Sequence, residues 1–185
     1  SWGVYYFEME KGYNIVTDST LVSVSSVCGF VGTVFSGLIS DKMFRSNRTI
    51  PACLSSLLNL AALALFLFGP RQCEILDIIS MILFGISIGI LLCFLGGLMA
   101  IDIAPKEATG AAVGVIGIAS YAAAGLQDVV SGFLIESRKA IVDGNPVYDF
   151  SAIRIFWLSA ALVSLLSLLI IWGARKKHVS SNIHY

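Results

Sequence analysis

Two long uncharged runs, separated by a short charged string, constrain this chain more than any other feature. The first run, 19–40, has no charged residue over 22 positions, and the second, 50–70, has none over 21. A helix rising about 1.5 Å per residue needs about 20 residues to cross a hydrocarbon layer about 30 Å thick. Because each run is long enough, we expect two membrane-spanning helices joined by a tight turn at the membrane surface.

The composition extends this expectation to the whole chain. It is 57% hydrophobic and 13% charged, with a mean hydropathy of +0.86, whereas soluble domains carry about 25% charged residues. We therefore expect an all-α protein that crosses the lipid bilayer several times. The 12 basic and 12 acidic residues balance, and no basic patch is visible, so we expect no nucleic-acid partner.

Hydropathy divides the chain into one partial span and five full spans. The partial span is 1–7, and the full spans are 19–40, 50–69, 78–101, 109–135 and 153–172. Together they form a transmembrane domain over 1–178, which a cytoplasmic tail at 179–185 follows. The partial span is rich in aromatic residues, which favour a membrane interface. We expect polar loops at 8–18 and 136–151. Since the chain begins directly in the partial span, we expect a piece of a longer protein.

The distribution of basic residues predicts the orientation in the membrane. Seven basic residues lie on one side: Lys42, Arg45, Arg48, Lys106, Arg175, Lys176 and Lys177. Five lie on the other: Lys11, Arg71, Arg138, Lys139 and Arg154. The positive-inside rule places the richer side, and with it the C-terminus, in the cytoplasm. We expect a multi-pass protein of the inner or plasma membrane.

The cysteines and the other reactive side chains do not form a chemical site. Cys28, Cys53 and Cys93 lie within apolar runs, and Cys73 has no partner in a loop, so we expect neither a disulfide nor a metal site. No nucleophile–base pair and no phosphate-cradling loop is visible. We therefore expect no enzyme and no cofactor.

Two short motifs carry a family resemblance. The charged string has the pattern G-x-x-x-D-K-x-x-R from Gly37 to Arg45, with Arg48 following, and is similar to the loop signature of major facilitator transporters. The segment 104–112 (APKEATGAA) resembles the loop between helices ten and eleven of organophosphate:phosphate antiporters. That family includes glycerol-3-phosphate and hexose-phosphate transporters and a sugar-phosphate sensor.

The resemblance implies a fold and a function. The chain would be the C-terminal six-helix half of a twelve-helix major facilitator fold, from the end of helix seven to helix twelve, with the N-terminal half missing. Such proteins bind substrate between their halves near the midplane. The implied function is exchange of a sugar phosphate or glycerol phosphate for inorganic phosphate by alternating access. Two alternatives are a membrane sensor of external sugar phosphate that acts with a signalling partner, and an inactive truncated fragment. The family's phosphate-binding arginines, in helices one and seven, would lie upstream of Ser1.

The charged string is the candidate cytoplasmic gating loop, formed by Gly37, Asp41, Lys42, Arg45 and Arg48. One interpretation is a solvated turn that only sets the topology. The other is a latch, because a carboxylate at the membrane surface can lie against the positive end of a neighbouring helix. In the family this loop faces the N-terminal half and helps to close the cytoplasmic side.

Asp128, beside Gln127 in the fourth span, is the sharpest single candidate for the substrate cavity. An ionisable group at the centre of a membrane helix costs about 2.5–3.5 kcal/mol on insertion scales, so it normally faces a cavity or a partner. One interpretation is a structural pair with Gln127 or with Arg154. The other is a cavity residue that tunes substrate choice or proton coupling.

Two further cavity candidates, Tyr121 and Ser26, come from the resemblance. Tyr121 matches a cavity tyrosine of the family, and a phenol can donate to a sugar or phosphate oxygen; an inter-helix hydrogen bond is the alternative. Ser26 occupies a position where relatives in the family carry a glutamate in helix eight, so the resemblance does not specify the substrate. Gly85 and Gly89 form a G-x-x-x-G pair that favours close helix packing, or sliding during transport.

The basic-residue count predicts that Asn47 and Ala104 are cytoplasmic and that Asn145 is external. Single cysteines at these positions, in a background without native cysteines, should react accordingly with a membrane-impermeant thiol reagent. External reactivity at position 47 would contradict the orientation.

Overall fold

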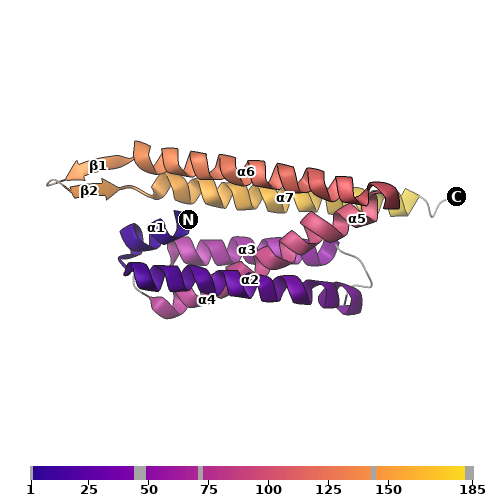
Figure 1. Cartoon of the computed structure of the whole chain (residues 1–185), viewed down its shortest axis with the longest axis horizontal. Coiled ribbons are helices and arrows are strands. Elements are labelled where there is room, and N and C mark those ends of the chain that lie inside the picture. Colours follow the sequence, from indigo (N-terminus) through magenta and orange to yellow (C-terminus); the bar gives the residue numbers. More distant parts are fainter. Residues whose placement is uncertain (1, 44–48, 71–72, 143–144, 182–185) are drawn as a thin grey trace.

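The computed structural model describes residues 2–43, 49–70, 73–142 and 145–181, which form a bundle of long helices with one small hairpin (Figure 1). The elements are α1 (Trp2–Tyr6), the π-helical turn η1 (Phe7–Lys11), α2 (Ile15–Met43), α3 (Thr49–Phe68), α4 (Glu74–Cys93), the π-helical turn η2 (Phe94–Leu98), α5 (Met99–Ile103), the 3-10 turn η3 (Lys106–Ala108), α6 (Thr109–Ser137), β1 (Lys139–Val142), β2 (Asn145–Tyr148) and α7 (Ser151–Ser181).

Among the described residues, five helical segments are long and apolar enough to cross a membrane, as the sequence predicts: Val16–Gly37, Thr49–Phe68, Glu74–Ile101, Lys106–Ser137 and Ser151–Gly173. The helices extend beyond several of the predicted spans. In particular, α2 continues to Met43, so the backbone of Asp41 and Lys42 belongs to a helix and not to a turn. Hydropathy marks only the part of a helix that lies in hydrocarbon, whereas backbone hydrogen bonding continues beyond it.

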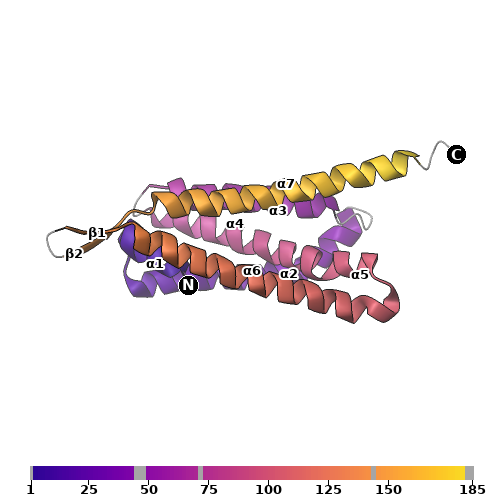
Figure 2. The same cartoon turned by 90° about the horizontal axis from the view of Figure 1, so that it is seen from above.

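The long helices form two layers. Helices α2, α3 and α4 make one layer, and α6 and α7 make the other (Figure 1). Helices α6 and α7 lie close together near the hairpin and diverge towards the C-terminus (Figure 2). Helix α7 packs on α3, whereas α6 touches the first layer through short elements near its ends. The hairpin projects beyond the helices, away from the C-terminus (Figure 2). We call the end of the bundle that carries β1, β2 and η1 the hairpin end.

Glycines bring α2 and α4 into backbone contact, which is the most extensive packing in the bundle. A Cβ added at Gly85 would lie 2.1 Å from the Ser25 carbonyl oxygen, and one at Gly89 would lie 2.0 Å from that of Gly29. The Thr33 hydroxyl donates across the same contact to the Gly89 carbonyl, at 3.1 Å. The expected close packing of the G-x-x-x-G pair is therefore confirmed, because small residues let helix backbones approach.

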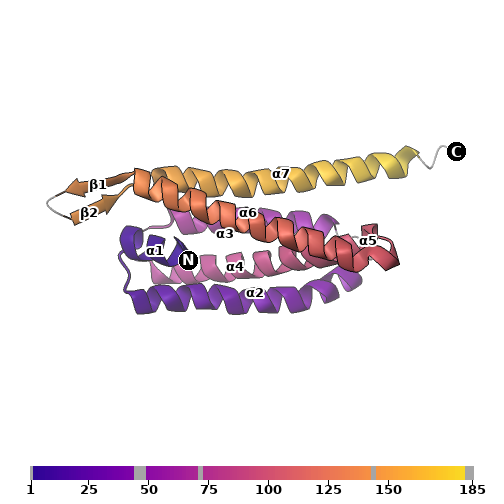
Figure 3. The same cartoon turned by 45° about the horizontal axis from the view of Figure 1, so that its top comes forward.

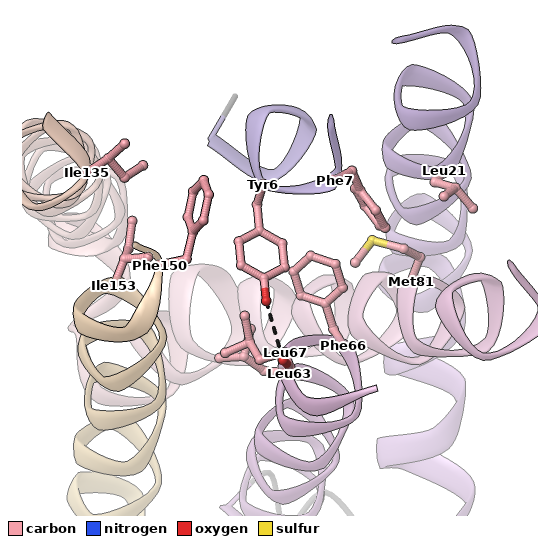
Figure 4. Close-up of a cluster of buried hydrophobic side chains, with 10 residues drawn as sticks. All are labelled: Tyr6, Phe7, Leu21, Leu63, Phe66, Leu67, Met81, Ile135, Phe150 and Ile153. Carbon is pink, nitrogen blue, oxygen red and sulfur yellow. Dashed lines mark hydrogen bonds between the residues drawn. The ribbon is translucent and has the colours of Figure 1, made fainter. Parts of the chain in front are cut away.

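The short N-terminal segment is the centre of the largest buried cluster, not an interfacial belt. Tyr6 and Phe7 are 1% and 0% exposed, and side chains from five long helices surround them (Figure 4). The Tyr6 hydroxyl donates to the Leu67 carbonyl, at 3.3 Å. The sequence-based expectation of interface aromatics was wrong for these two rings, because packing against α3 and the start of α7 encloses them.

A buried polar network fastens η1 to two other helices. Lys11 forms an ion pair with Asp77 at the start of α4, and both side chains are at most 2% exposed. The Tyr13 hydroxyl donates to the same carboxylate, at 3.0 Å; burial and this hydrogen bond raise the pKa of Tyr13 above its usual value. Glu10 forms a second ion pair with Arg154 of α7.

The segment expected as a polar loop at 136–151 contains an antiparallel hairpin. Lys139 of β1 pairs with Tyr148 of β2 in its register, and the Tyr148 ring contacts Tyr5 at 5.5 Å between centroids. The strands were missed because the segment is short and its apolar residues do not alternate over enough positions to suggest a strand.

The Lys11–Asp77 pair gives the first structural prediction. In the full-length protein, Asp77→Asn should destabilise the fold by about 3–5 kcal/mol, because it leaves the Lys11 ammonium buried without its counter-charge. The double variant Lys11→Met/Asp77→Leu should recover most of that loss. Unfolding by SDS titration measures both.

The exposed pair of Arg138 and Asp149, 3.4 Å apart with side chains 55% and 53% exposed, is the matched control. Asp149→Asn should leave the unfolding midpoint nearly unchanged, since exposed ion pairs contribute little. A loss in Asp149→Asn as large as in Asp77→Asn would show that burial is not the cause.

Candidate functional site

A cavity of about 480 Å³ lies between the two helix layers, beside α1. Most of its wall is apolar, and the apolar lining residues are Trp2, Gly3, Phe7, Val22, Leu63, Phe66, Met81, Phe84, Ile88, Trp157, Ala160 and Ala161. Its polar residues are Ser25, Asn59, Gln127 and Asp128. A mostly apolar concave site with a few converging polar groups is the usual form of a ligand pocket.

Two indole groups fix α6 beside the cavity. The Trp2 indole N–H donates to the backbone carbonyl of Asp128, at 3.0 Å, and the Trp157 indole N–H donates to the Ser131 hydroxyl, at 3.1 Å. Trp2 also lies directly against Gly132, where an added Cβ would be 2.8 Å from the ring. These contacts hold α6 to α1 and α7 at the level of Gln127 and Asp128.

The polar groups on the opposite wall are already engaged. The Asn59 side-chain amide donates to the Ser87 hydroxyl, at 3.2 Å, and the Ser25 hydroxyl donates to the Val22 carbonyl, at 2.7 Å. By contrast, the side chains of Gln127 and Asp128 are exposed. The α6 wall therefore offers the groups that can bind a further partner.

The structure brings together only part of the predicted cavity set. Gln127 and Asp128 line the cavity, whereas Ser26 and Tyr121 do not. The Ser26 hydroxyl donates to the Val22 carbonyl, at 3.2 Å. Tyr121 is 83% exposed and forms no hydrogen bond with the part of the chain that the structure describes, so the alternative inter-helix bond is not found there.

The alternative pairing of Asp128 with Arg154 was wrong. Arg154 binds Glu10 of η1, and its guanidinium also lies 5.7 Å from the centroid of the Tyr6 ring. The sequence suggested the wrong partner because Arg154 and Asp128 both lie towards the same end of adjacent spans, while η1 was expected to be a loop.

The described part of the candidate gating loop lies at the opposite end of the bundle from the hairpin (Figure 1). Gly37 is in α2, and the backbone of Asp41 and Lys42 continues that helix. Arg45 and Arg48 lie outside the described residues. The latch interpretation therefore remains a prediction.

Sequence reasoning missed three residues that shape the cavity: Trp2, Asn59 and Trp157. Asn59 carries a usable signal, since it is a polar amide within the uncharged run 50–70, and polar groups in membrane helices normally face a partner or a cavity. The two tryptophans carry no comparable signal in the sequence beyond the size of their side chains. Their roles depend on which helices lie beside them.

The charge of the cavity limits what it can bind alone. Asp128 is the one ionisable side chain among the described lining residues, and no lysine or arginine is among them. An anionic ligand needs cationic donors, so this wall cannot hold a phosphate group by itself.

Comparison with known proteins identifies the family. The family model of the Major Facilitator Superfamily matches residues 1–127, more than half of the chain. The chain belongs to the Major Facilitator Superfamily. The expectations of an all-α major facilitator fragment and of a protein that is not an enzyme are confirmed, because this is a superfamily of multi-pass transporters.

Individual relatives are distant. The chain is 27% identical to the glycerol-3-phosphate transporter of Bacillus subtilis (strain 168) over 184 residues, which cover 96% of this chain and 38% of that protein. It is 25% identical to a probable galactarate/D-glucarate transporter of Escherichia coli (strain K12) over 183 residues, with the same coverage. It is 32% identical to the membrane sensor protein UhpC of Escherichia coli (strain K12) over 130 residues, covering 68% of this chain and 28% of that protein. The chain thus spans about 38% of the length of the first two relatives.

The position of Asp128 gives a prediction for the full-length protein. Asp128→Asn should change the ranking of substrates or the pH dependence of transport by roughly tenfold, the factor that 1.4 kcal/mol corresponds to. Its carboxylate is the one formally charged group on the described cavity wall, and the amide keeps the size of the side chain.

Glu136→Gln is the control for Asp128→Asn. Glu136 lies on the same helix outside the cavity, paired with Lys139 at 3.2 Å. Uptake rates over a range of pH and substrates measure both variants. An unchanged substrate ranking and pH profile in Asp128→Asn, at normal expression, would leave only a structural role.

Proposed function

We propose that the full-length protein exchanges a phosphorylated small molecule, such as glycerol phosphate or a sugar phosphate, for inorganic phosphate by alternating access. The similarity to a glycerol-3-phosphate transporter along 96% of the chain is the observation that carries this proposal. The two loop motifs, Gly37–Arg45 and 104–112, support it.

The cavity supports a role as one part of a larger site. Its described lining holds a carboxylate and two amides but no cation, so the cations for an anionic substrate come from chain outside this sequence. Trp2 and Gly3, the first described residues of α1, line the cavity, and the N-terminus lies between the two layers (Figure 3). We place the preceding part of helix seven, with its phosphate-binding arginine, along this cavity.

In this arrangement Asp128 has a specific task. A carboxylate in direct contact with a phosphate would repel it, whereas a carboxylate beside an arginine orients the guanidinium through charge-assisted hydrogen bonds. Asp128 and Gln127 would therefore position the upstream arginine. Ser26 and Tyr121, on exposed faces of α2 and α6, would face the missing N-terminal half.

The orientation completes the proposal. The end of α2 at Asp41 faces the cytoplasm together with the C-terminus, and the hairpin faces outward. Asp41, Lys42, Arg45 and Arg48 then form a latch against the N-terminal half. Asp41→Asn is expected to slow cycling more than it weakens substrate binding.

Two specific observations favour other functions. Identity to the sensor UhpC is higher, at 32%, over a shorter match, which favours a receptor that binds but does not transport. Similarity to a probable galactarate/D-glucarate transporter favours a sugar acid as the substrate. Both alternatives keep an anionic ligand.

Exchange by the purified full-length protein distinguishes these functions. Liposomes preloaded with inorganic phosphate should take up labelled glycerol 3-phosphate or glucose 6-phosphate several-fold faster than liposomes without internal phosphate. Labelled D-glucarate should not enter. Binding of a phosphate ester without uptake would indicate the sensor, and phosphate-independent uptake of glucarate would indicate a sugar-acid transporter.

A further inference from the structure

Asp18 is a buried carboxylate without a partner. It lies in the first turn of α2 and is 0% exposed. Neither of its carboxylate oxygens has a hydrogen-bond partner among the described residues. The helix start is instead capped by Asn14, whose Oδ1 accepts from the Val16 N–H, at 3.5 Å. A buried charge normally has a counter-charge or several donors, so this carboxylate requires another explanation.

The charges around Asp18 do not supply a counter-charge within the described chain. Glu8, on η1, contributes a further negative charge in its surroundings. The remaining ionisable groups of the elements packed here are engaged with one another or exposed: Lys11 and Tyr13 bind Asp77, Arg154 binds Glu10, and Glu74 is exposed. The two cations of this network are therefore used by other carboxylates.

We propose that Asp18 is a proton-binding site at the hairpin end of the bundle. A hydronium ion transfers its proton to a carboxylate oxygen of Asp18 and leaves as water, so the side chain enters its buried position as a neutral acid. Neutralisation removes both the cost of an unpaired buried charge and the repulsion from Glu8.

A proton fits this position better than a metal ion. Within the described residues, no group of three or more His, Cys, Asp or Glu side chains is placed to hold a metal. A sodium or magnesium ion needs several oxygen ligands, whereas a proton needs one oxygen and no additional volume.

The position of Asp18 links the proton to the packing of η1. One turn further along α2, Leu21 lies in the same buried cluster as Phe7 of η1 and Met81 of α4 (Figure 4). Glu8 follows Phe7 directly, and Gly12, with φ 73°, forms the left-handed turn that leads from η1 towards α2. Water reaches Asp18 when this contact loosens, so release of the proton accompanies separation of η1 from α2. This site does not depend on which substrate is transported.

Infrared spectroscopy of the full-length protein in membranes tests the proposal. The wild-type protein at neutral pH should show the C=O stretching band of a protonated carboxylic acid, and Asp18→Asn should lose it. Glu8→Gln should keep the band but shift its loss to lower pH, because the neighbouring negative charge is removed. Asp149→Asn is the control: hydrogen bonds from Ser151 hold the pKa of Asp149 below its usual range, so this variant should not change the band.

Unfolding provides a second, independent measurement. Because the folded state holds a proton that the unfolded state has released, raising the pH should favour unfolding by up to tenfold in the equilibrium constant per pH unit, and Asp18→Asn should remove this component. A wild-type spectrum without an acid band that depends on Asp18 would overturn the proposal. So would sodium-dependent stability that Asp18→Asn abolishes, which would identify a metal ion instead. If the Asp18→Asn variant does not accumulate, the pH at which the acid band is lost in Glu8→Gln tests the proposal by itself: an unchanged pH would overturn it.

Discussion

The buried ion pair between Lys11 and Asp77 is the interaction on which the rest of this structure depends. It holds the short segment formed by α1 and η1 at the start of α4, with both charges excluded from solvent. Tyr6 and Phe7 of that segment are then enclosed by side chains from every long helix. Without this anchor, the layer of α6 and α7 would meet the other layer mainly where α7 packs on α3.

Helix α6 has the most open surface among the described spans, and it carries Gln127 and Asp128 of the cavity wall. The most apolar 18-residue stretch of the span Lys106–Ser137, which contains most of α6, has no buried residue. In the spans Thr49–Phe68 and Glu74–Ile101, 39% of the corresponding stretch is buried. Large side chains such as Ile118 and Phe133 are more than 70% exposed on this helix. A helix with an apolar surface this open is covered by lipid or by another part of the protein, which agrees with a chain that spans a minor part of its relatives' length.

The sequence drew attention to Asp128 and Gln127, which line the cavity, because an ionisable group within an apolar run is conspicuous whatever surrounds it. Of the two structural partners considered for Asp128, Gln127 and Arg154, the second is paired with Glu10 instead. The sequence predicted that Asp18 lies in the polar loop 8–18, whereas this residue lies in α2 and is fully buried. The error has a simple origin: a carboxylate near the end of an apolar run is expected to reach water, and only the packing of neighbouring elements can prevent it.

The sequence by itself determined that this chain crosses a membrane, how many spans it has and which superfamily it belongs to. The spans are local properties, because a run of about 20 apolar residues forms a helix that lipid stabilises wherever it lies. The resemblance to the superfamily is local too, because it rests on two short contiguous motifs. Tertiary structure alone decided the Lys11–Asp77 pair, the backbone contact of Gly85 and Gly89 with α2, the cavity beside Trp2 and the isolation of Asp18. Each of these depends on the relative position and rotation of helices far apart in the chain, and hydropathy carries no information on either.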